Sequence, residues 1–336
     1  MLNVNTLVLG MRGSGKTCAL SSMYAIMTYG VNYFSLTALD RKQKSLLNDY
    51  WKGMKNGYLP DASYDGQMFS LVCSHSFNPL CQVNWYDYPG GWTDMIHENR
   101  EDLEEKMISA DCIICCIPTD ELVKAYKSKT YLECMQHYND LFNFYGMHKT
   151  GTKYVPIVFM LTKFDLCKDK NLVKDAISDY IKHSPFGSKT AKWLTVVIPV
   201  TLGSNIKIYQ NSEGKSCIDE ATLEPEYIHL PIMFSICKKL SESLLNKINL
   251  MKEKKISISQ IASAISEMEN KFLVWNKDDK IALKNNSITN IKEELDSIIS
   301  DADNITQNLE LVRNELIEGI QLAYYKGEPC EINEVI

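Results

Sequence analysis

The sequence lacks any run of about 20 apolar residues, the length that a transmembrane helix needs, so we expect no integral membrane segment. It also lacks an excess of positive charge. The 36 Lys and Arg residues face 42 Asp and Glu residues, and the net charge of −6 at pH 7 argues against a broad surface for nucleic acid. No basic leader precedes the first apolar run, and no lipidation box is present. We expect a cytoplasmic chain with no nucleic acid partner.

The eleven cysteines lie mostly inside apolar runs such as residues 111–118. Cys112 and Cys115 have the CxxC spacing of half a zinc site. No second pair lies nearby, and both residues fall in an apolar run that reads as a buried strand, so the pattern favours free thiols in the core. Free thiols fit a reducing compartment.

What is present is an ordinary globular composition, 45% hydrophobic and 23% charged, in a chain of 336 residues that is long enough for one or two domains. Short apolar runs alternate with helix-length spacers up to about residue 250. The runs are residues 6–10, 68–73, 82–88, 112–118, 155–162 and 194–201. They predict an α/β fold with a mostly parallel sheet flanked by helices.

The spacing of these runs predicts more detail. Only eight residues separate the second run from the third, which favours an antiparallel hairpin. We therefore expect a six-stranded sheet with one antiparallel edge strand. A helix from about Leu230 to Met251 is expected to close this domain.

Beyond residue 250, apolar residues recur at spacings of three and four. One series runs from Ile258 to Trp275, and a second series of four heptads runs from Ile288 to Leu316. This period is that of a coiled-coil seam, and the polar break between the series predicts an antiparallel helical hairpin. The alternative is that both helices pack on the first domain. We expect domains at residues 1–250 and 251–325, and a flexible end at residues 326–336.

Residues 10–17, GMRGSGKT, match G-x-x-x-x-G-K-[ST] directly after a predicted strand and before a predicted helix. The glycines let successive backbone N–H groups point inward and form an anion site at the helix N-terminus. Lys16 would bridge the outer phosphates of a nucleotide, and the Thr17 hydroxyl would coordinate Mg²⁺. The expected contacts are Gly10, Gly13, Ser14, Gly15, Lys16, Thr17 and Cys18.

A phosphate loop does not choose between ATP and GTP, but residues 162–165, TKFD, favour guanine. Guanine presents its N1–H and N2 amino groups side by side, and a carboxylate at Asp165 would accept from both, whereas adenine has an acceptor at N1. Lys163 would lay its aliphatic stem along the base. Thr162, Lys163 and Asp165 are therefore the expected base contacts.

Four motifs follow one another in the order of a known family. After the phosphate loop come residues 87–90, DYPG, then TKFD, then residues 199–204, PVTLGS. With this order and spacing, residues 3–250 resemble the TRAFAC-class P-loop GTPases, and the Thr-first base motif resembles that of Rho-like small GTPases. The resemblance implies GTP or GDP and Mg²⁺ as ligands. It implies that Asp87 holds Mg²⁺ through a water, that the Gly90 amide senses the γ-phosphate, and that Thr201 and Leu202 support the guanine carbonyl.

Residues 34–63 form an unusually long segment between the first predicted helix and the second predicted strand. The resemblance implies that one Thr or Ser here completes the Mg²⁺ shell. Thr37 and Ser63 are the candidates, and Ser63 is favoured because it lies directly before the strand. The pattern from Trp51 to Ser63 also resembles bacterial double-GTPase-type proteins, which occur near antiviral conflict systems.

Gly91 stands where many such GTPases carry a glutamine that positions water. A glycine has no side chain for that task, so we expect slow unaided hydrolysis. An arginine could neutralise charge in the transition state. The phosphate-loop arginine of guanylate-binding proteins would correspond to Gly13, and His97 is a candidate for orienting water. The chain has four arginines, of which the first is the leading candidate: Arg12, Arg41, Arg100 and Arg313.

Two functions fit these motifs. The first is a Mg²⁺-dependent GTPase with Lys16, Arg12 and Gly90 as catalytic groups, slow alone and faster on self-association or with a partner protein through the C-terminal helices. The second is a scaffold module that holds GTP with little or no turnover. The retained Lys16, Thr17 and Asp87 favour the first, because a structural ligand does not need a complete Mg²⁺ shell, whereas the glycine at position 91 favours the second. An ATPase or another phosphate-loop activity is the remaining alternative.

Overall fold

The computed structural model describes residues 1–61, 66–90, 100–130, 136–148, 154–203, 206–212, 215–218, 223–270 and 276–336. The chain forms two compact units. One unit joins Met1–Lys238 with Arg313–Ile336, and the other is Lys239–Val312. The domain boundaries at residues 250 and 325 that the sequence suggests remain predictions.

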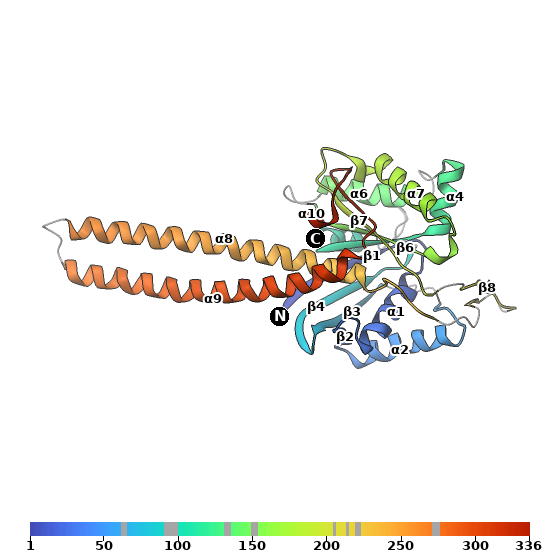
Figure 1. The fold of residues 1–336 in the computed structure, drawn as a ribbon, viewed down its shortest axis with the longest axis horizontal. Coiled ribbons are helices and arrows are strands. Elements are labelled where there is room, and N and C mark those ends of the chain that lie inside the picture. The colour runs from blue at the N-terminus through green and yellow to red at the C-terminus, as the bar shows by residue number, and fades with distance from the viewer. Residues whose placement is uncertain are drawn as a thin grey trace. The chain divides into compact units, whose positions relative to one another are not determined.

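A mixed β-sheet is the centre of the first unit (Figure 1). Its nine described strands lie in the order β11-β10-β7-β6-β5-β1-β4-β3-β2. Neighbours from β7 to β4 are parallel, whereas the outer strands β3, β2, β10 and β11 run antiparallel to their neighbours. The strands are β1 (Leu2–Leu9), β2 (Phe34–Ala38), β3 (Gln67–His75), β4 (Asn78–Asp87), β5 (Cys112–Pro118), β6 (Ile157–Thr162), β7 (Leu194–Pro199), β10 (Leu322–Tyr325) and β11 (Glu328–Pro329).

The six predicted apolar runs are β1, β3, β4, β5, β6 and β7, and β3 and β4 form the predicted antiparallel pair. The prediction of six strands is wrong, because three more strands extend the sheet. On one side β2 pairs with β3, so β3 is not the edge strand. On the other side β10 and β11 lie beyond β7. These additions pair backbone groups that a six-stranded sheet would leave exposed at its edges.

Helices cover both faces of this sheet: α1 and α2 lie on one face, and α4, α6 and α7 lie on the other (Figure 1). The segment that the sequence presents only as long and unassigned contains β2 and α2. The Asp40 carboxylate caps α2 by accepting from the Lys42 amide at 2.7 Å. The helices of the first unit are α1 (Lys16–Tyr29), α2 (Arg41–Lys55), α3 (Arg100–Ser109), α4 (Thr119–Ser128), α6 (Gln136–His148), α7 (Lys170–His183) and α10 (Ile332–Val335), with 3₁₀ turns η2 (Phe164–Leu166) and η3 (Pro185–Gly187).

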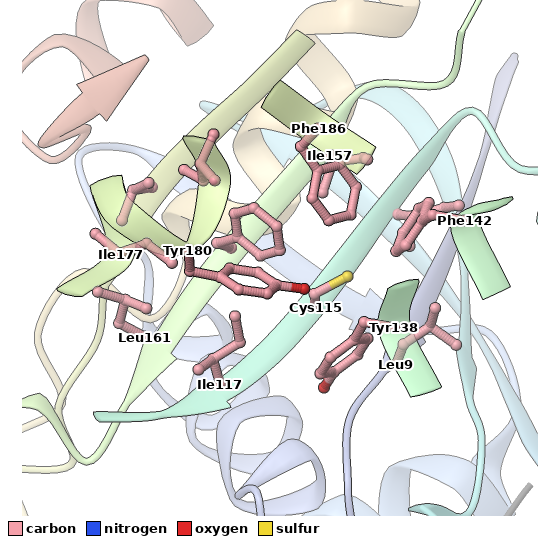
Figure 2. Packing of buried hydrophobic residues seen from close by; sticks show 14 of the residues in the cluster. Leu9, Cys115, Ile117, Tyr138, Phe142, Ile157, Leu161, Ile177, Tyr180 and Phe186 are labelled. Atoms are coloured by element: carbon pink, nitrogen blue, oxygen red, sulfur yellow. The ribbon is translucent and has the colours of Figure 1, made fainter. Parts of the chain in front are cut away.

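A large aromatic and aliphatic core fills the space between the sheet and α3, α4, α6 and α7 (Figure 2). The ring of Phe186 meets those of Phe142 and Phe159 edge-on, with centroids 4.7 and 5.1 Å apart. Cys112 and Cys115 are both fully buried in β5, and the ten cysteines that the structure describes are free thiols. This packing holds the carboxyl ends of β1, β5, β6 and β7 in fixed relation.

The second unit contains most of two long helices, α8 (Leu230–Glu269) and α9 (Lys277–Ile317). The Lys247 ammonium pairs with Asp301 at 2.6 Å, and Lys254 pairs with Glu294. A step of seven residues forward on α8 thus matches seven residues back on α9, so the predicted antiparallel hairpin is confirmed. A coiled-coil seam stays a prediction. None of the described helices is both long and apolar enough to cross a membrane.

The C-terminal segment belongs to the first unit. The sequence suggests a flexible end at residues 326–336, whereas the structure shows β11, α10 and a buried terminus, with Ile336 4% exposed. Arg313 donates to the Ile336 carbonyl, and the Lys238 ammonium donates to the Val335 carbonyl at 3.1 Å. These contacts hold the last residues of the chain against the first part of α8 and the last part of α9.

Candidate functional site

The phosphate-loop motif lies where its pattern predicts, between the end of β1 and the first turn of α1. Gly15 is the N-cap of α1 and has φ of 88°, and Gly13 has φ of 78°. Both values lie in the left-handed region that glycine adopts without strain. The loop therefore curls into the N-terminus of α1, where backbone N–H groups and the helix dipole favour an anion.

Lys16 is folded back beneath this loop. Its ammonium donates to the Gly10 carbonyl at 2.6 Å and to the Met11 carbonyl at 3.2 Å, and the side chain is buried. Burial lowers the pKa of Lys16, while the negative charge of Asp87 opposes that shift. An anion bound in the loop would offset the cost of burying this cation.

Thr17 and Asp87 meet beside the lysine, with the Thr17 hydroxyl 3.3 Å from Asp87 Oδ2. Asp87 ends β4 and is 3% exposed, and its Oδ1 atom has no hydrogen-bond partner among the described residues. Burial raises the pKa of Asp87 to about 6, against the opposing effects of Lys16 and Thr17. A buried carboxylate with one unpartnered oxygen next to a hydroxyl fits a hard divalent cation.

Gly90 is held against the phosphate loop. A Cβ at this position would lie 2.2 Å from the Arg12 amide nitrogen and 2.5 Å from the Met11 carbonyl carbon. Those contacts are with backbone, so no larger residue fits without moving the loop. Of the neighbouring candidates, Gly91 and His97 lie outside the described residues.

The TKFD motif is joined to the phosphate loop by a buried hydrogen bond. The Thr162 hydroxyl donates to the Ser14 carbonyl at 2.7 Å, and the Thr162 carbonyl accepts from the Thr119 hydroxyl at 2.8 Å. Lys163 then takes φ of 53°, which turns the chain into η2. Half-burial raises the pKa of Asp165, with the backbone and Lys170 opposing. These hydrogen bonds hold the first residue of the TKFD motif beside the phosphate loop.

Thr201 and Leu202 follow β7 and are held by a short backbone ladder. The amide of Thr201 donates to the Glu226 carbonyl at 3.3 Å, and the Leu202 carbonyl accepts from the Glu224 amide at 2.9 Å. Both residues face the same cavity as the two motifs above.

That cavity has a volume of about 480 Å³, within the range of ordinary ligand pockets. Most of the residues predicted as nucleotide contacts line it. They are Arg12, Gly13, Ser14, Gly15, Lys16, Thr17, Cys18, Gly90, Thr162, Lys163, Asp165, Thr201 and Leu202. Two further predicted residues support the lining: Gly10 accepts from Lys16, and Asp87 accepts from Thr17.

The two candidates for the remaining Mg²⁺ ligand have different outcomes. Thr37 is exposed in the middle of β2, opposite Val72, and is not part of the cavity lining. Ser63 lies outside the described residues. Of the other arginines, Arg41 is exposed at the start of α2, and Arg313 binds the C-terminal residue. Arg12 remains the one cavity-lining arginine among the residues that the structure describes.

The sequence reading missed another group of residues that line the cavity. They are Ala19, Leu59, Pro60, Asp61, Leu166, Val200, Ile206, Ile208, Lys215, Ser216 and Ile228. Several of them come from a small hairpin, β8 (Ile208–Gln210) and β9 (Ser216–Ile218), and from the chain after α2. Strands of three residues leave almost no periodicity to detect, and only the polar and glycine residue types at positions 211–214, NSEG, hint at a hairpin.

These observations define a class: an α/β protein with a phosphate-loop motif between its first strand and first helix. No family model matches the chain, and no curated protein matches it. Seventy chains of solved structures do.

Three of these structures show the level of likeness. The bacterial selenocysteine-specific elongation factor EF-Sec has a TM-score of 0.33 and 14% identity, over 59% of this chain and 26% of its own. The GTP-bound Ski7 GTPase-like domain of S. cerevisiae has a TM-score of 0.37 and 17% identity, over 66% of this chain and 46% of its own. The GDP-bound small COPII coat GTPase SAR1 of Encephalitozoon cuniculi has a TM-score of 0.32 and 12% identity, over 60% of this chain and 70% of its own. The chain thus spans less than half of the first two proteins, and likenesses of this size assign no activity.

Proposed function

We propose that this protein binds GTP and GDP with Mg²⁺ and hydrolyses GTP. One observation carries the proposal: a single cavity is lined by Lys16 and Thr17 of the phosphate loop and by Asp165 of the TKFD motif, and Thr162 of that motif donates a hydrogen bond to Ser14 of the loop. A phosphate site and a guanine-reading carboxylate in one cavity suit a guanine nucleotide better than any other common ligand.

In the proposed complex, loop N–H groups and the Lys16 ammonium hold the outer phosphates and neutralise charge that builds up on them during hydrolysis. Thr17, and Asp87 through its unpartnered Oδ1, would hold Mg²⁺, which when bound supplies further neutralisation of the phosphates. The described residues contain no cluster of three or more His, Cys, Asp or Glu that could hold a metal. That fits Mg²⁺, which is usually held by one or two protein groups together with substrate phosphates and water.

At the other part of the cavity, we propose that the protein recognises guanine by accepting its hydrogen bonds. Asp165 accepts from guanine N1–H and the N2 amino group, and the aliphatic stem of Lys163 lies along the ring. The Lys163 ammonium lies 3.9 Å from the Asp120 carboxylate, which gives that stem a preferred direction. Thr201 and Leu202 are the proposed support for the guanine carbonyl.

Isothermal titration calorimetry with GTP, GDP, ATP and xanthosine triphosphate, each with Mg²⁺, tests the proposal. Binding of the two guanosine nucleotides and rejection of ATP are expected. An equal or higher affinity for ATP would overturn it.

The rate is proposed to depend on association of the protein with itself or with a partner protein. Gly91 has no side chain that could orient water, and Arg12 is exposed on the phosphate loop. The second unit bears exposed apolar side chains, Leu245, Ile256 and Leu283, 56, 57 and 67% exposed, which support a role for the helices in contacts with another protein. The alternative, a scaffold that holds GTP without turnover, predicts no phosphate release at any protein concentration.

A concentration series separates these readings. We expect the specific rate of phosphate release to rise with protein concentration, and to lose that rise in a variant with a shortened hairpin. Truncation after residue 255 would also remove β10 and β11 from the sheet. Positions 251 and 297 are opposite each other in the register of the hairpin, so the shortened variant has a short glycine-rich turn in place of residues 251–297. A measurable rate that does not change with concentration would place all catalytic groups within one chain.

The likeness to double-GTPase-type proteins of antiviral conflict systems stays a prediction. Its pattern begins at Trp51 on α2 and runs through Leu59 and Pro60 at the cavity, but its last residue, Ser63, lies outside the described part of the chain. The cytoplasm remains the proposed location.

A further inference from the structure

The hairpin β8–β9 is joined to the chain that follows α2. Tyr58 and Cys217 form an isolated antiparallel bridge. On one side of it the Leu59 amide donates to the Ser216 carbonyl at 3.2 Å, and on the other the Ile218 amide donates to the Gly57 carbonyl at 2.9 Å. Residues 57–59 thus act as a third strand beside β9, although about 160 residues separate them in the sequence.

A small hydrophobic cluster, separate from the main core, fixes this three-stranded arrangement. Its buried members are Met54 of α2, Ile206 and Ile218. Partly buried side chains pack around them: Cys18, Trp51, Leu59, Leu202 and Leu223. The cluster therefore connects α2, the hairpin, the loop after β7 and the first turn of α1.

The same two segments line the candidate site. Leu59, Pro60 and Asp61 contribute from the chain after α2, and Ile208, Lys215 and Ser216 contribute from the hairpin. Neither segment carries any of the four motifs. Together they supply a part of the lining that the motifs do not, and the two backbone hydrogen bonds that flank the Tyr58–Cys217 bridge join the two segments.

We propose that residues 57–61 and the β8–β9 hairpin form a clasp that is part of the nucleotide site and limits the rate at which nucleotide leaves it. This inference rests on the proposed function. Because the clasp joins the chain after α2 to the hairpin after β7, a bound nucleotide keeps both segments in place, and release requires the bridge at Tyr58 to open.

The bridge offers a reversible lock. The two hydrogen bonds join Leu59 to Ser216 and Ile218 to Gly57, so Tyr58 and Cys217 are a non-hydrogen-bonded antiparallel pair, whose Cα atoms lie at a separation that a disulfide can span. Tyr58 is 55% exposed and neither residue lines the cavity, so Tyr58→Cys adds a thiol opposite the native Cys217 without touching the site.

The experiment measures release of a fluorescent N-methylanthraniloyl-GDP from the full-length chain, with Mg²⁺, chased by unlabelled GDP. Oxidised Tyr58→Cys is expected to release it at least about tenfold more slowly than the reduced form, because the reduced bridge opens once two ordinary backbone hydrogen bonds break, whereas the oxidised bridge is also held by a covalent bond. Dithiothreitol should restore the original rate. Tyr58→Ser and the double variant Tyr58→Cys/Cys217→Ser are the controls, and neither should respond to oxidation.

Mass spectrometry identifies the disulfide. If it forms and the release rate stays the same, the clasp does not limit release and the proposal is wrong. If the introduced thiol does not pair with Cys217 under oxidising conditions, the bridge itself is absent and the proposal is wrong for that reason. Failure of the wild-type chain to bind any guanine nucleotide would instead overturn the proposed function.

A second variant acts in the opposite direction. Gly57 has φ of 86°, and a Cβ there would lie 3.2 Å from the Ile218 carbonyl oxygen, so Gly57→Ala strains the bridge. Gly53→Ala, in α2, meets only the Tyr58 carbonyl oxygen at 3.6 Å and is the matched control. Gly57→Ala should release nucleotide several-fold faster, and Gly53→Ala should not. Equal rates in the two variants would contradict the clasp.

Discussion

Replacing Asp87 with asparagine is expected to stabilise the ligand-free protein while weakening its binding of magnesium and nucleotide. Asp87 is 3% exposed, and burial raises its pKa from 3.8 to about 6 even though Lys16 and Thr17 favour the charged form. At neutral pH the carboxylate is ionised in the folded and unfolded states. The raised pKa therefore measures a cost of keeping that charge inside the fold.

The size of this cost follows from the shift. About two pKa units at 1.36 kcal/mol each give roughly 3 kcal/mol. Asparagine has nearly the same shape and is neutral, and its carbonyl oxygen can still accept from the Thr17 hydroxyl at the place of Oδ2. Its NH₂ group would replace Oδ1, which has no partner among the described residues, and this costs about 1 kcal/mol. The net expected gain in the free energy of unfolding is therefore about 2 kcal/mol at pH 7.

The dependence of stability on pH provides a second test of this cost, because its direction follows from the raised pKa of Asp87. The folded pKa of Asp87 lies above the unfolded value, so between pH about 4 and 6 the folded state binds more protons than the unfolded state. The contribution of this group to stability must then fall as pH rises through that window, and it is constant above it. Wild type should therefore lose stability relative to Asp87→Asn as pH rises through this window, because other carboxylates with raised pKa values, such as Asp165, are present in both proteins.

The assay is urea unfolding followed by circular dichroism at pH 4.5 and pH 7, without nucleotide. Asp49→Asn, an exposed change on α2, is the control and should leave stability unchanged. Calorimetry with GTP and Mg²⁺ then measures the functional loss. An Asp87→Asn protein that is less stable than wild type at pH 7, or that binds GTP·Mg²⁺ with undiminished affinity, would refute the reasoning.

Two further changes test the two ends of the cavity. Lys16→Ala removes the buried ammonium that would pair with phosphate, and we expect GTP affinity to fall by at least about 100-fold, or roughly 3 kcal/mol, in calorimetry; an unchanged affinity would contradict the phosphate-loop assignment. Asp165→Asn replaces an acceptor by an amide and should shift preference from GTP toward xanthosine triphosphate, whose C2 carbonyl accepts where guanine's amino group donates, with a change in the affinity ratio of about 100-fold. If that variant still selects GTP as wild type does, Asp165 does not read the base.

The sequence by itself determined the parts of this protein whose signals are local. Six apolar runs became β1 and β3 to β7. A strand buried on both faces, such as β5, β6 or β7, must be apolar along its length, whereas β3 and β4 alternate between buried and partly exposed residues. The glycines of residues 10–17 fixed the loop, since only that residue type takes the φ of Gly13 and Gly15 without strain. The candidate contacts of the phosphate loop and of Asp165 could be named from the sequence because each of these motifs is a short stretch of consecutive residues.

Tertiary structure decided the rest, because it depends on partners distant in the chain. Nothing local in Leu322–Tyr325 specifies that it pairs with β7, since that choice depends on which sheet edge is left open once the parallel strands have formed. The clasp needs Tyr58 to meet Cys217, and the pKa of Asp87 needs burial beside Lys16. A strand pairing over such separations, or the desolvation of one carboxylate, is a property of the packed chain and leaves no periodic trace in the order of its residues.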